Sequence, residues 1–266
     1  MEIDAKTVMK LRNETGLSMM ECKKALQETN GDVEAAIDHL RKKLKGKMDA
    51  RSDRAAGEGR VTIATGGTGA AIVELRAETD FTAKNEAFGK VTETIAQQAL
   101  SAPAGAVAPT PEMLKLVDEI RISTGENISI ARIHKLEGGA FGQYVHHDGK
   151  KAALLQATGP IPADLARMIC MHIVSAVPQP KGVSANDIPS EIVDKERKFR
   201  IEQAMESGKP KEIAEKMVEG GMRKFFEEIA LLEQPYVVDP SKKVKELLPA
   251  GVTVTTFRRW QVGEES

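Results

Sequence analysis

The stretch Glu78–Asn85, with the sequence ETDFTAKN, lies where a buried strand gives way to a helical pattern. The apolar run at 70–75 predicts the strand, and the residues from Thr82 to about 100 predict the helix. An acid, Asp80, and a large aromatic, Phe81, therefore lie together at a strand-to-helix corner. Two interpretations stay open. Either Asp80 caps the helix and Phe81 closes the local core, or both side chains face a binding partner.

The composition excludes several classes of protein. The 266 residues carry a net charge of −1, so the charge of the whole chain predicts no direct binding to nucleic acid. No apolar run is long enough to span a membrane, and the N-terminus lacks the basic and apolar regions of a signal peptide. Two cysteines, Cys22 and Cys170, are too few for a disulfide framework and favour a reducing, cytoplasmic location.

Residues 1–54 predict a small domain of three helices followed by a basic linker. Ser18 and Glu21 have the spacing of a capping box for the second helix, and Asn30-Gly31 is suited to ending it. Asp32 is expected to cap the third helix. Three short helices in about 45 residues can bury only a small core. This resembles the compact bundle of ubiquitin-associated domains, which are binding modules rather than enzymes. Met19 and Met20 lie at the start of the second helix. Either one of them fills that core, or the two form an adaptable apolar contact surface.

The stretch 41–60 is a basic connector, for which a solvated helical linker is the first interpretation. A phosphate-binding arm is the weaker alternative because no aromatic residue interleaves the charges. The basic side chains are Arg41, Lys42, Lys43, Lys45, Lys47, Arg51, Arg54 and Arg60.

Two α+β subdomains are predicted after the linker, which makes the chain an α+β multidomain protein. The first covers 55–140, and its glycines at 65–69 indicate a hairpin turn because no Gly-Lys-Ser/Thr follows them. The second covers 141–180 and 230–266. In the first subdomain we expect strands at 61–64, 71–73 and 127–136 and helices at 82–100 and 112–124. In the second we expect strands at 141–146, 151–157 and 252–257 and a helix at 163–177.

An inserted helical hairpin is predicted at 181–229, with its turn at Ser207–Pro210. Gly past one helix end and Pro at the start of the next are the usual punctuation of such a turn. The side chains expected to pack between the two arms are Ile192, Phe199 and Met205 on the first and Ile213, Met217 and Phe225 on the second.

Catalytic constellations are scarce. His146 and His147 precede Asp148 in a pattern that resembles a metal or acid/base cluster, but neighbouring strand residues point to opposite faces, and Asp148-Gly149 favours a hairpin turn. His172 lies among apolar helix residues and is expected in a core. No nucleotide-binding motif is present, and neither cysteine has a histidine partner by motif.

Four stretches, in this order along nearly the whole chain, resemble the bacterial elongation factor Ts family. They are TGLSMMECKKAL at 15–26 with Asn30-Gly31-Asp32, ETDFTAKNEAF at 78–88, YVHHDGK at 144–150 and SGKPKEIAEKMVEGGMRKF at 207–225. The family's architecture is a ubiquitin-associated-like N-terminal domain, two α+β core subdomains and a coiled-coil insertion, in agreement with the elements predicted here.

The resemblance implies a guanine nucleotide exchange factor for elongation factor Tu that uses no cofactor and no covalent chemistry. Thr79, Asp80, Phe81 and Thr82 match the family's segment that dislocates Mg²⁺ from elongation factor Tu. Phe81 is implied to wedge between helices of the GTPase domain, while Asp80 helps to displace the groups that hold the ion.

Further contacts are implied by the same resemblance. The residues implied to bind elongation factor Tu, in its GDP-bound and nucleotide-free forms, are Met19, Met20, Lys23 and His147. A homodimer through the hairpin is a further expectation, whereas membranes and direct nucleic-acid contacts are not expected. Many relatives carry a short helical module after the last strand, and this sequence stops at Val262–Ser266, so the resemblance does not extend to a contact made by that module.

Two alternatives from other functional classes stay open. A ribosome- or RNA-associated adapter that uses the basic connector predicts strongly salt-dependent RNA binding. A hydrolase or metalloenzyme built on His146, His147 and Asp148 predicts metal in the purified protein.

Overall fold

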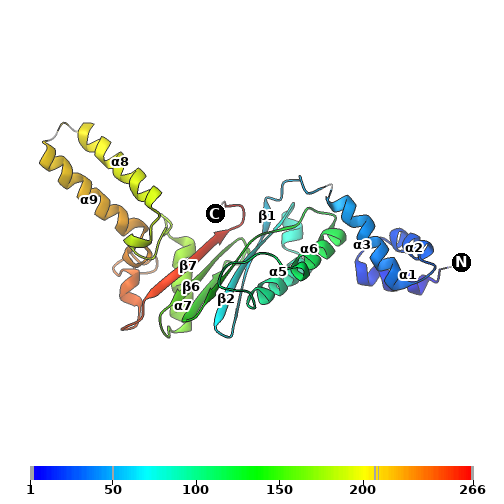
Figure 1. Cartoon of the computed structure of the whole chain (residues 1–266). Coiled ribbons are helices and arrows are strands. Elements are labelled where there is room, and N and C mark those ends of the chain that lie inside the picture. Colours follow the sequence, from blue (N-terminus) through cyan, green and yellow to red (C-terminus); the bar gives the residue numbers. More distant parts are fainter. Residues whose placement is uncertain (1–2, 50, 207, 209, 265–266) are drawn as a thin grey trace. The chain divides into compact units, whose positions relative to one another are not determined.

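The computed structural model describes residues 3–49, 51–206, 208 and 210–264, and it combines helices with two sheets (Figure 1). This mixture agrees with the predicted α+β class. The chain divides into two compact units. Unit 1 contains Met1–Leu136, His147–Lys150 and Gln261–Ser266, and unit 2 contains Glu137–His146 and Lys151–Trp260. Among the described residues, no helix is both long enough and apolar enough to cross a bilayer.

Unit 1 begins with three helices, α1 (Ala5–Thr15), α2 (Met19–Glu28) and α3 (Val33–Asp49). The predicted capping box is confirmed, because Ser18 Oγ accepts a hydrogen bond from the Glu21 backbone at 3.3 Å and Ser18 N donates to the Glu21 carboxylate at 3.3 Å. Asn30 adopts the expected left-handed conformation, with φ of 54°. The shared core of the three helices contains Val8, Leu11, Leu17, Cys22, Leu26 and Leu40.

The predicted helical linker is confirmed as far as Asp49, where α3 ends, and Lys42, Lys43 and Lys45 are exposed as expected. The expectation that the linker is only solvated needs a correction, because some of its basic groups pair with helix α6 (Pro111–Thr124). Arg41 pairs with Glu119 at 2.7 Å, and Lys45 pairs with Asp118 at 3.1 Å. These basic groups therefore serve intramolecular contacts. Such half-exposed pairs contribute little stability individually, so they orient the connector more than they stabilise it.

A four-stranded sheet follows, in the order β1-β2-β4-β3, made of β1 (Glu58–Gly66), β2 (Gly69–Ala77), β4 (Ser129–Glu137) and β3 (Gly105–Ala106). β1 and β2 pair antiparallel with Gly66 opposite Gly69, which confirms the predicted glycine hairpin. Gly67 in that turn has φ of +55°, a conformation that favours glycine. β2 is buried along almost its whole length, as its unbroken apolar run predicts.

Helix α5 (Glu86–Ala99) packs on β1 and β2 and contacts α6 (Figure 1). The single helix predicted over 82–100 is wrong at its start. A four-residue helix, α4 (Asp80–Ala83), forms first, and Asn85 then caps α5 by accepting a hydrogen bond from Ala87 N at 2.8 Å. The core under these elements contains Phe88, Ile95, Met113, Val117, Ile120 and Ile128.

Unit 2 contains a three-stranded sheet in the order β5-β6-β7, covered by helix α7 (Ala163–Ser175). The strands are β5 (Ala140–Val145), β6 (Lys151–Ala157) and β7 (Val254–Gln261), close to the predicted ranges. β5 and β6 pair antiparallel. Gly142 allows α7 to approach β5 closely, because an added Cβ would lie 2.7 Å from the Ala166 methyl. His172 on α7 is buried, as predicted.

The inserted helices α8 (Ser190–Glu206) and α9 (Lys211–Ile229) pack against each other (Figure 1). The described residues of the predicted turn include Gly208 and Pro210, whereas Ser207 and Lys209 lie outside them. The predicted packing between the arms is wrong for most of the named side chains: only Ile192 and Phe225 are partly buried, at the base of the pair. The four that are exposed are Phe199, Met205, Ile213 and Met217.

Candidate functional site

Phe81 projects from the strand-to-helix corner into solvent. Its exposed fraction is 84%, whereas Phe88, seven residues later, is fully buried. The interpretation that Phe81 closes the local core is therefore wrong, because Phe88 takes that place. Burying a Phe side chain is worth about 1.5–3 kcal/mol relative to leaving it exposed, so the fold forgoes this stabilisation at Phe81. The exposed ring is available to another molecule.

The turn that carries Phe81 is capped by Thr79 rather than by Asp80, which corrects the other half of that interpretation. Thr79 Oγ1 accepts a hydrogen bond from Thr82 N at 3.3 Å, and Thr79 O accepts one from Ala83 N at 3.2 Å. Thr82 is buried, so the turn has one side anchored in unit 1 while Phe81 faces outward.

Asp80 presents a carboxylate next to the exposed ring. Lys84 Nζ lies 2.7 Å from Asp80 Oδ2, one helical turn along the chain. The hydrogen bond from Lys84 holds the pKa of Asp80 below its ordinary value, and the more distant charge of Lys150 adds to this effect. Asp80 is therefore ionised at neutral pH. Because Lys84 is 67% exposed, a competing cation or donor can replace it at little cost.

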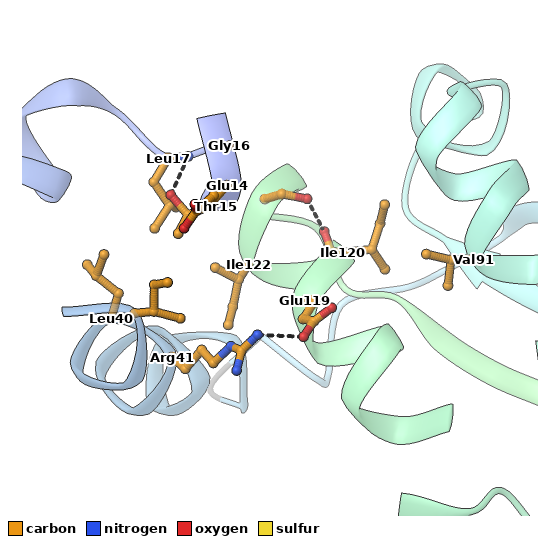
Figure 2. Close-up of a pocket in the computed structure, with 12 residues that line it drawn as sticks. Glu14, Thr15, Gly16, Leu17, Leu40, Arg41, Val91, Glu119, Ile120 and Ile122 are labelled. Carbon is orange, nitrogen blue, oxygen red and sulfur yellow. Dashed lines mark hydrogen bonds and ion pairs between the residues drawn. The ribbon is translucent and has the colours of Figure 1, made fainter. Parts of the chain in front are cut away.

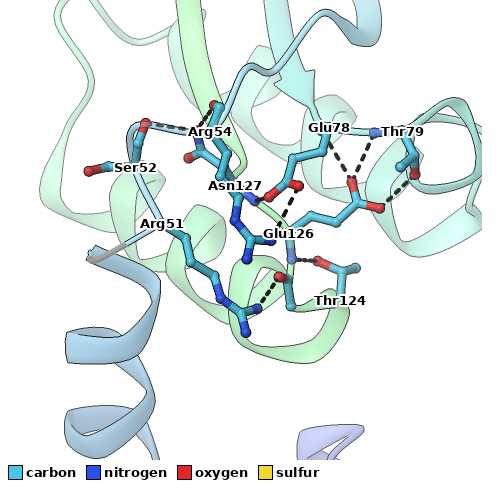
Figure 3. A network of polar contacts seen from close by, with 9 residues as sticks. Arg51, Ser52, Arg54, Glu78, Thr79, Thr124, Glu126 and Asn127 are labelled. Atoms are coloured by element: carbon cyan, nitrogen blue, oxygen red, sulfur yellow. Dashed lines mark hydrogen bonds and ion pairs between the residues drawn. The ribbon is translucent and has the colours of Figure 1, made fainter.

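Glu126, in the loop between α6 and β4, holds the start of this turn (Figure 3). Glu126 Oε2 accepts hydrogen bonds from Glu78 N and Thr79 N, both at 3.1 Å, and Glu126 Oε1 accepts one from Thr79 Oγ1 at 2.6 Å. Partial burial raises the pKa of Glu126, but the hydrogen bonds from Thr79, Thr82 and the backbone together lower it below its ordinary value. The carboxylate is therefore charged, and charged acceptors make the stronger hydrogen bonds.

The next residue, Asn127, connects the same loop to the connector (Figure 3). Asn127 N donates to Glu78 Oε1 at 2.7 Å, and Asn127 Nδ2 donates to the carbonyls of Ser52 and Arg54 at 2.9 and 2.8 Å. Sequence reasoning missed both Glu126 and Asn127. The only signal was two polar residues between the helix-ending Gly125 and a strand, a pattern equally typical of a solvated loop.

The other predicted partner-binding residues are exposed. Met19 and Met20 have exposed fractions of 41% and 76%, so the interpretation that one of them fills the small core is wrong. Lys23 is exposed on the same helix, α2, and His147 is exposed in the turn after β5. These residues are not part of the hydrogen-bond network described above around Thr79, and their role in binding stays a prediction.

The two neighbouring histidines do not gather the ligands of a metal site. His146 Nδ1 lies 2.9 Å from the Tyr144 hydroxyl, and in the part of the chain that the structure describes no three His, Cys, Asp or Glu side chains cluster to hold an ion. The predicted turn at Asp148-Gly149 is confirmed by a hydrogen bond from Lys150 N to Asp148 Oδ1 at 2.8 Å. Burial raises the pKa of the Cys170 thiol, which argues against a thiolate nucleophile.

A groove of about 470 Å³ lies between the α1–α3 helices and α6 (Figure 2). Its lining includes Leu17, Leu40 and Ile122, with the Arg41–Glu119 ion pair beside them. None of the residues of the Thr79–Thr82 turn lines it. Half of the twelve lining residues are aliphatic, and the hydroxyls of Thr15 and Ser123 donate to the backbone carbonyls of Leu11 and Ile120, so the groove has the character of a packing gap rather than an active site.

Comparison with known proteins decides the family. The family model described as Elongation factor TS matches residues 78–264, starting at the residue before Thr79. This chain belongs to the elongation factor Ts family. The elongation factor Ts proteins of Thioalkalivibrio sulfidiphilus, Idiomarina loihiensis and Pasteurella multocida are 45%, 42% and 42% identical to it. Each alignment covers 99% of this chain and 92–93% of the relative, so the resemblance seen in the sequence is confirmed and the chain is a member of a family of translation elongation factors.

Proposed function

We propose that this protein promotes the release of GDP from elongation factor Tu, so that GTP can bind. The exposure of Phe81 on a turn whose other side is anchored carries the proposal. The ring wedges between helices of the GTPase domain, and the Asp80 carboxylate competes with the groups that hold Mg²⁺. Thr79 and Thr82 keep the two side chains in place.

The effect on Mg²⁺ explains how a protein without covalent chemistry can accelerate release. Mg²⁺ neutralises the charge of the GDP phosphates and demands near-ideal octahedral coordination. A wedge that displaces its ligands weakens the binding of the nucleotide. By linkage, GDP must weaken the binding of this protein as much as the protein weakens that of GDP, so nucleotide-free elongation factor Tu is bound most tightly.

The remaining surfaces supply affinity in this proposal. The α1–α3 helices form the family's ubiquitin-associated-like domain, and Met19, Met20 and Lys23 hold the GTPase domain. His147 contacts a more distant domain of elongation factor Tu. The two sheets belong to the family's two core subdomains, α8 and α9 form its coiled coil, and the exposed side chains of that pair support a homodimer. The protein acts in the cytoplasm, without a membrane or nucleic-acid partner.

The described residues favour this proposal over the two alternatives. The RNA-adapter hypothesis needs free basic groups on the connector, and it is weakened because Arg41 and Lys45 form ion pairs and Arg51 donates to the Gly125 carbonyl at 2.6 Å, which leaves Lys42 and Lys43 as its exposed basic residues among the described side chains of α3. The metalloenzyme hypothesis needs His146 and His147 to share a ligand, and His146 is engaged by Tyr144.

The test is Phe81→Ala, followed by stopped-flow release of a fluorescent GDP from elongation factor Tu. We expect release to slow about thirtyfold, which corresponds to about 2 kcal/mol, the loss typical of a central aromatic contact. Phe199→Ala is the matched control, because Phe199 is also an exposed Phe, at 54%, but lies on α8. Release at the normal rate by a Phe81→Ala protein that still binds elongation factor Tu would remove the wedge from the mechanism.

A further inference from the structure

The Thr79–Thr82 turn depends on a residue outside its own sequence. The Glu126 carboxylate accepts hydrogen bonds from the backbone N–H groups of Glu78 and Thr79 and from the Thr79 hydroxyl. Thr79 uses the same hydroxyl oxygen to cap α4 through Thr82 N. Glu126 therefore fixes both the backbone that enters the turn and the rotamer of the residue that caps it.

We propose that Glu126 is a positioning residue for the Phe81 wedge: its carboxylate holds the turn in the conformation that the partner binds. This inference rests on the proposed function, because it assigns Glu126 a role in the same event. Glu126 acts through Thr79, and nothing in the proposal requires it to touch elongation factor Tu.

The need for such an anchor follows from the size of the turn. α4 has only four residues, and isolated helices shorter than about 12 residues are marginal in water. An exposed Phe81 contributes almost no packing that would hold the turn. The backbone N–H groups of Glu78 and Thr79 also lie just past Ala77, where the β1–β2 ladder ends, and both donate to Glu126 Oε2. The Glu126 carboxylate supplies the missing acceptor for both groups.

Loss of the Glu126 carboxylate should weaken the binding of elongation factor Tu more than it changes the complex once formed. If the turn keeps its native conformation in only about one tenth of free molecules, the apparent Kd rises about tenfold, because binding must first select that fraction. A saturating concentration of the partner restores the conformation. Glu126→Ala should therefore weaken the apparent affinity for nucleotide-free elongation factor Tu about tenfold and leave the maximal rate of GDP release unchanged.

The experiment is a double-mutant cycle of Glu126→Ala with Thr79→Val, read out by affinity and by maximal release rate. Both changes remove the bond between Glu126 Oε1 and Thr79 Oγ1, so we expect the loss of affinity in the double variant to be smaller than the sum of the two single losses. Glu126→Ala should have the larger single effect, because it also removes the acceptor of the Glu78 and Thr79 N–H groups. Glu93→Ala, which truncates an exposed carboxylate on α5, is the matched control and should behave as wild type. Fully additive losses would show that Glu126 does not act through the Thr79 hydroxyl and would overturn the proposal.

A measurement on the free protein separates this inference from the proposed function. Amide hydrogen exchange at Glu78 and Thr79 should accelerate about tenfold or more in Glu126→Ala, while exchange in β2 stays slow and shows that the unit is folded. Unchanged protection of the two amides would overturn the positioning role. Failure of the wild-type protein to release GDP would instead reject the proposed function, and the exchange data would still decide whether Glu126 orders the turn.

Discussion

The Thr79–Thr82 turn and the α8–α9 pair both expose a Phe, but they are supported in opposite ways. The turn in unit 1 follows a buried strand and is held by hydrogen bonds to Glu126. The pair in unit 2 presents Phe199 from a long helix whose only buried residue among those described is Ala204. Phe81 is thus a short, anchored projection, and Phe199 belongs to an element that is stabilised mainly by its own contacts.

The difference between Phe81 and Phe199 shows which exposed aromatic side chains indicate a functional site. An exposed Phe on a long helix is compatible with the ordinary apolar share of a protein surface, so its exposure alone does not identify a functional contact. An exposed Phe on a four-residue helix, with an ionised Asp80 beside it and a dedicated carboxylate behind it, combines several features that packing alone does not require. The support behind the ring, more than its exposure, distinguishes the candidate site.

The strongest test of this comparison is the stability of three Phe→Ala variants. Phe88→Ala should lower the free energy of unfolding by about 3–5 kcal/mol, because it empties a fully buried site in the core of unit 1. Phe81→Ala and Phe199→Ala should each change it by less than about 0.5 kcal/mol, since both rings are exposed. Urea unfolding followed by far-ultraviolet circular dichroism gives the three values.

One outcome breaks the comparison outright. If Phe81→Ala destabilises the protein as strongly as Phe88→Ala does, the ring contributes to the core and the turn is not an independent projection. A loss confined to Phe88→Ala keeps stability and recognition separable, so that any slower GDP release in Phe81→Ala can be assigned to the missing contact.

The sequence predicted most of the elements around the site because their signals are local. The buried strand before the turn, the capping box at Ser18 and the turn at Asp148-Gly149 each follow from residues a few positions apart. The break between α4 and α5 was missed because Thr79, Asp80 and Asn85 are all good caps, and only the tertiary structure selects Thr79 and Asn85.

The anchor of the turn was not predictable, because its members lie far apart in the sequence. Glu126 is 47 residues from Thr79, and nothing in the sequence around either residue indicates that they meet. The exposure of the hairpin side chains had a different cause. Spacing alone placed Phe199 and Met217 on facing arms, but small residues occupy part of the contact, as the buried Ala204 shows.

A second test concerns how the base of the α8–α9 pair is held. His172 on α7 is buried, its Nε2 lies 3.0 Å from Gln234 Oε1, and its Nδ1 accepts a hydrogen bond from Val237 N at 3.3 Å. Gln234 in turn donates to the carbonyls of Pro178 and Glu228. His172 Nδ1 must stay unprotonated to accept, so the base is held by a neutral histidine, in contrast to the charged Glu126 behind the turn.

Burial lowers the pKa of His172 below its ordinary value, which fixes the sign of a pH effect. Below about pH 6.5 the unfolded chain takes up a proton that the folded unit does not, so stability falls as the pH falls from there toward the folded pKa. The limiting slope is about 1.4 kcal/mol per pH unit. Trp260, the single tryptophan, lies buried in unit 2 and reports its unfolding by fluorescence.

Matched histidine variants isolate this effect from other titrations. His172→Gln should reduce the loss of stability between about pH 6.5 and pH 5.5, whereas His147→Gln, which alters an exposed side chain, should keep the wild-type slope. Identical slopes in the two variants would show that His172 does not set the pH dependence of stability. The contrast between a neutral His172 at the base of the helix pair and a charged Glu126 behind the turn would then have no effect on stability.

The smallest expected effect lies within α9, where two adjacent glycines differ in their surroundings. A Cβ on Gly220 would meet no atom within 4 Å, whereas one on Gly221 would lie 3.1 Å from Arg200 Cδ. Gly220→Ala should therefore stabilise the helix pair by about 0.5–1 kcal/mol through higher helix propensity. Gly221→Ala should gain less, because Arg200 must move from its 2.7 Å contact with Glu196. Amide hydrogen exchange along α9 measures both changes.

The same two variants sharpen the comparison between the regions. If the α8–α9 pair is stabilised by its own contacts, slower opening of α9 in Gly220→Ala should leave the amides of Glu78 and Thr79 and the rate of GDP release unchanged. The turn has its own anchor in Glu126, so its order does not require a rigid hairpin. A change in release that follows the stability of α9 would contradict this separation, because it would make the helix pair part of the exchange mechanism.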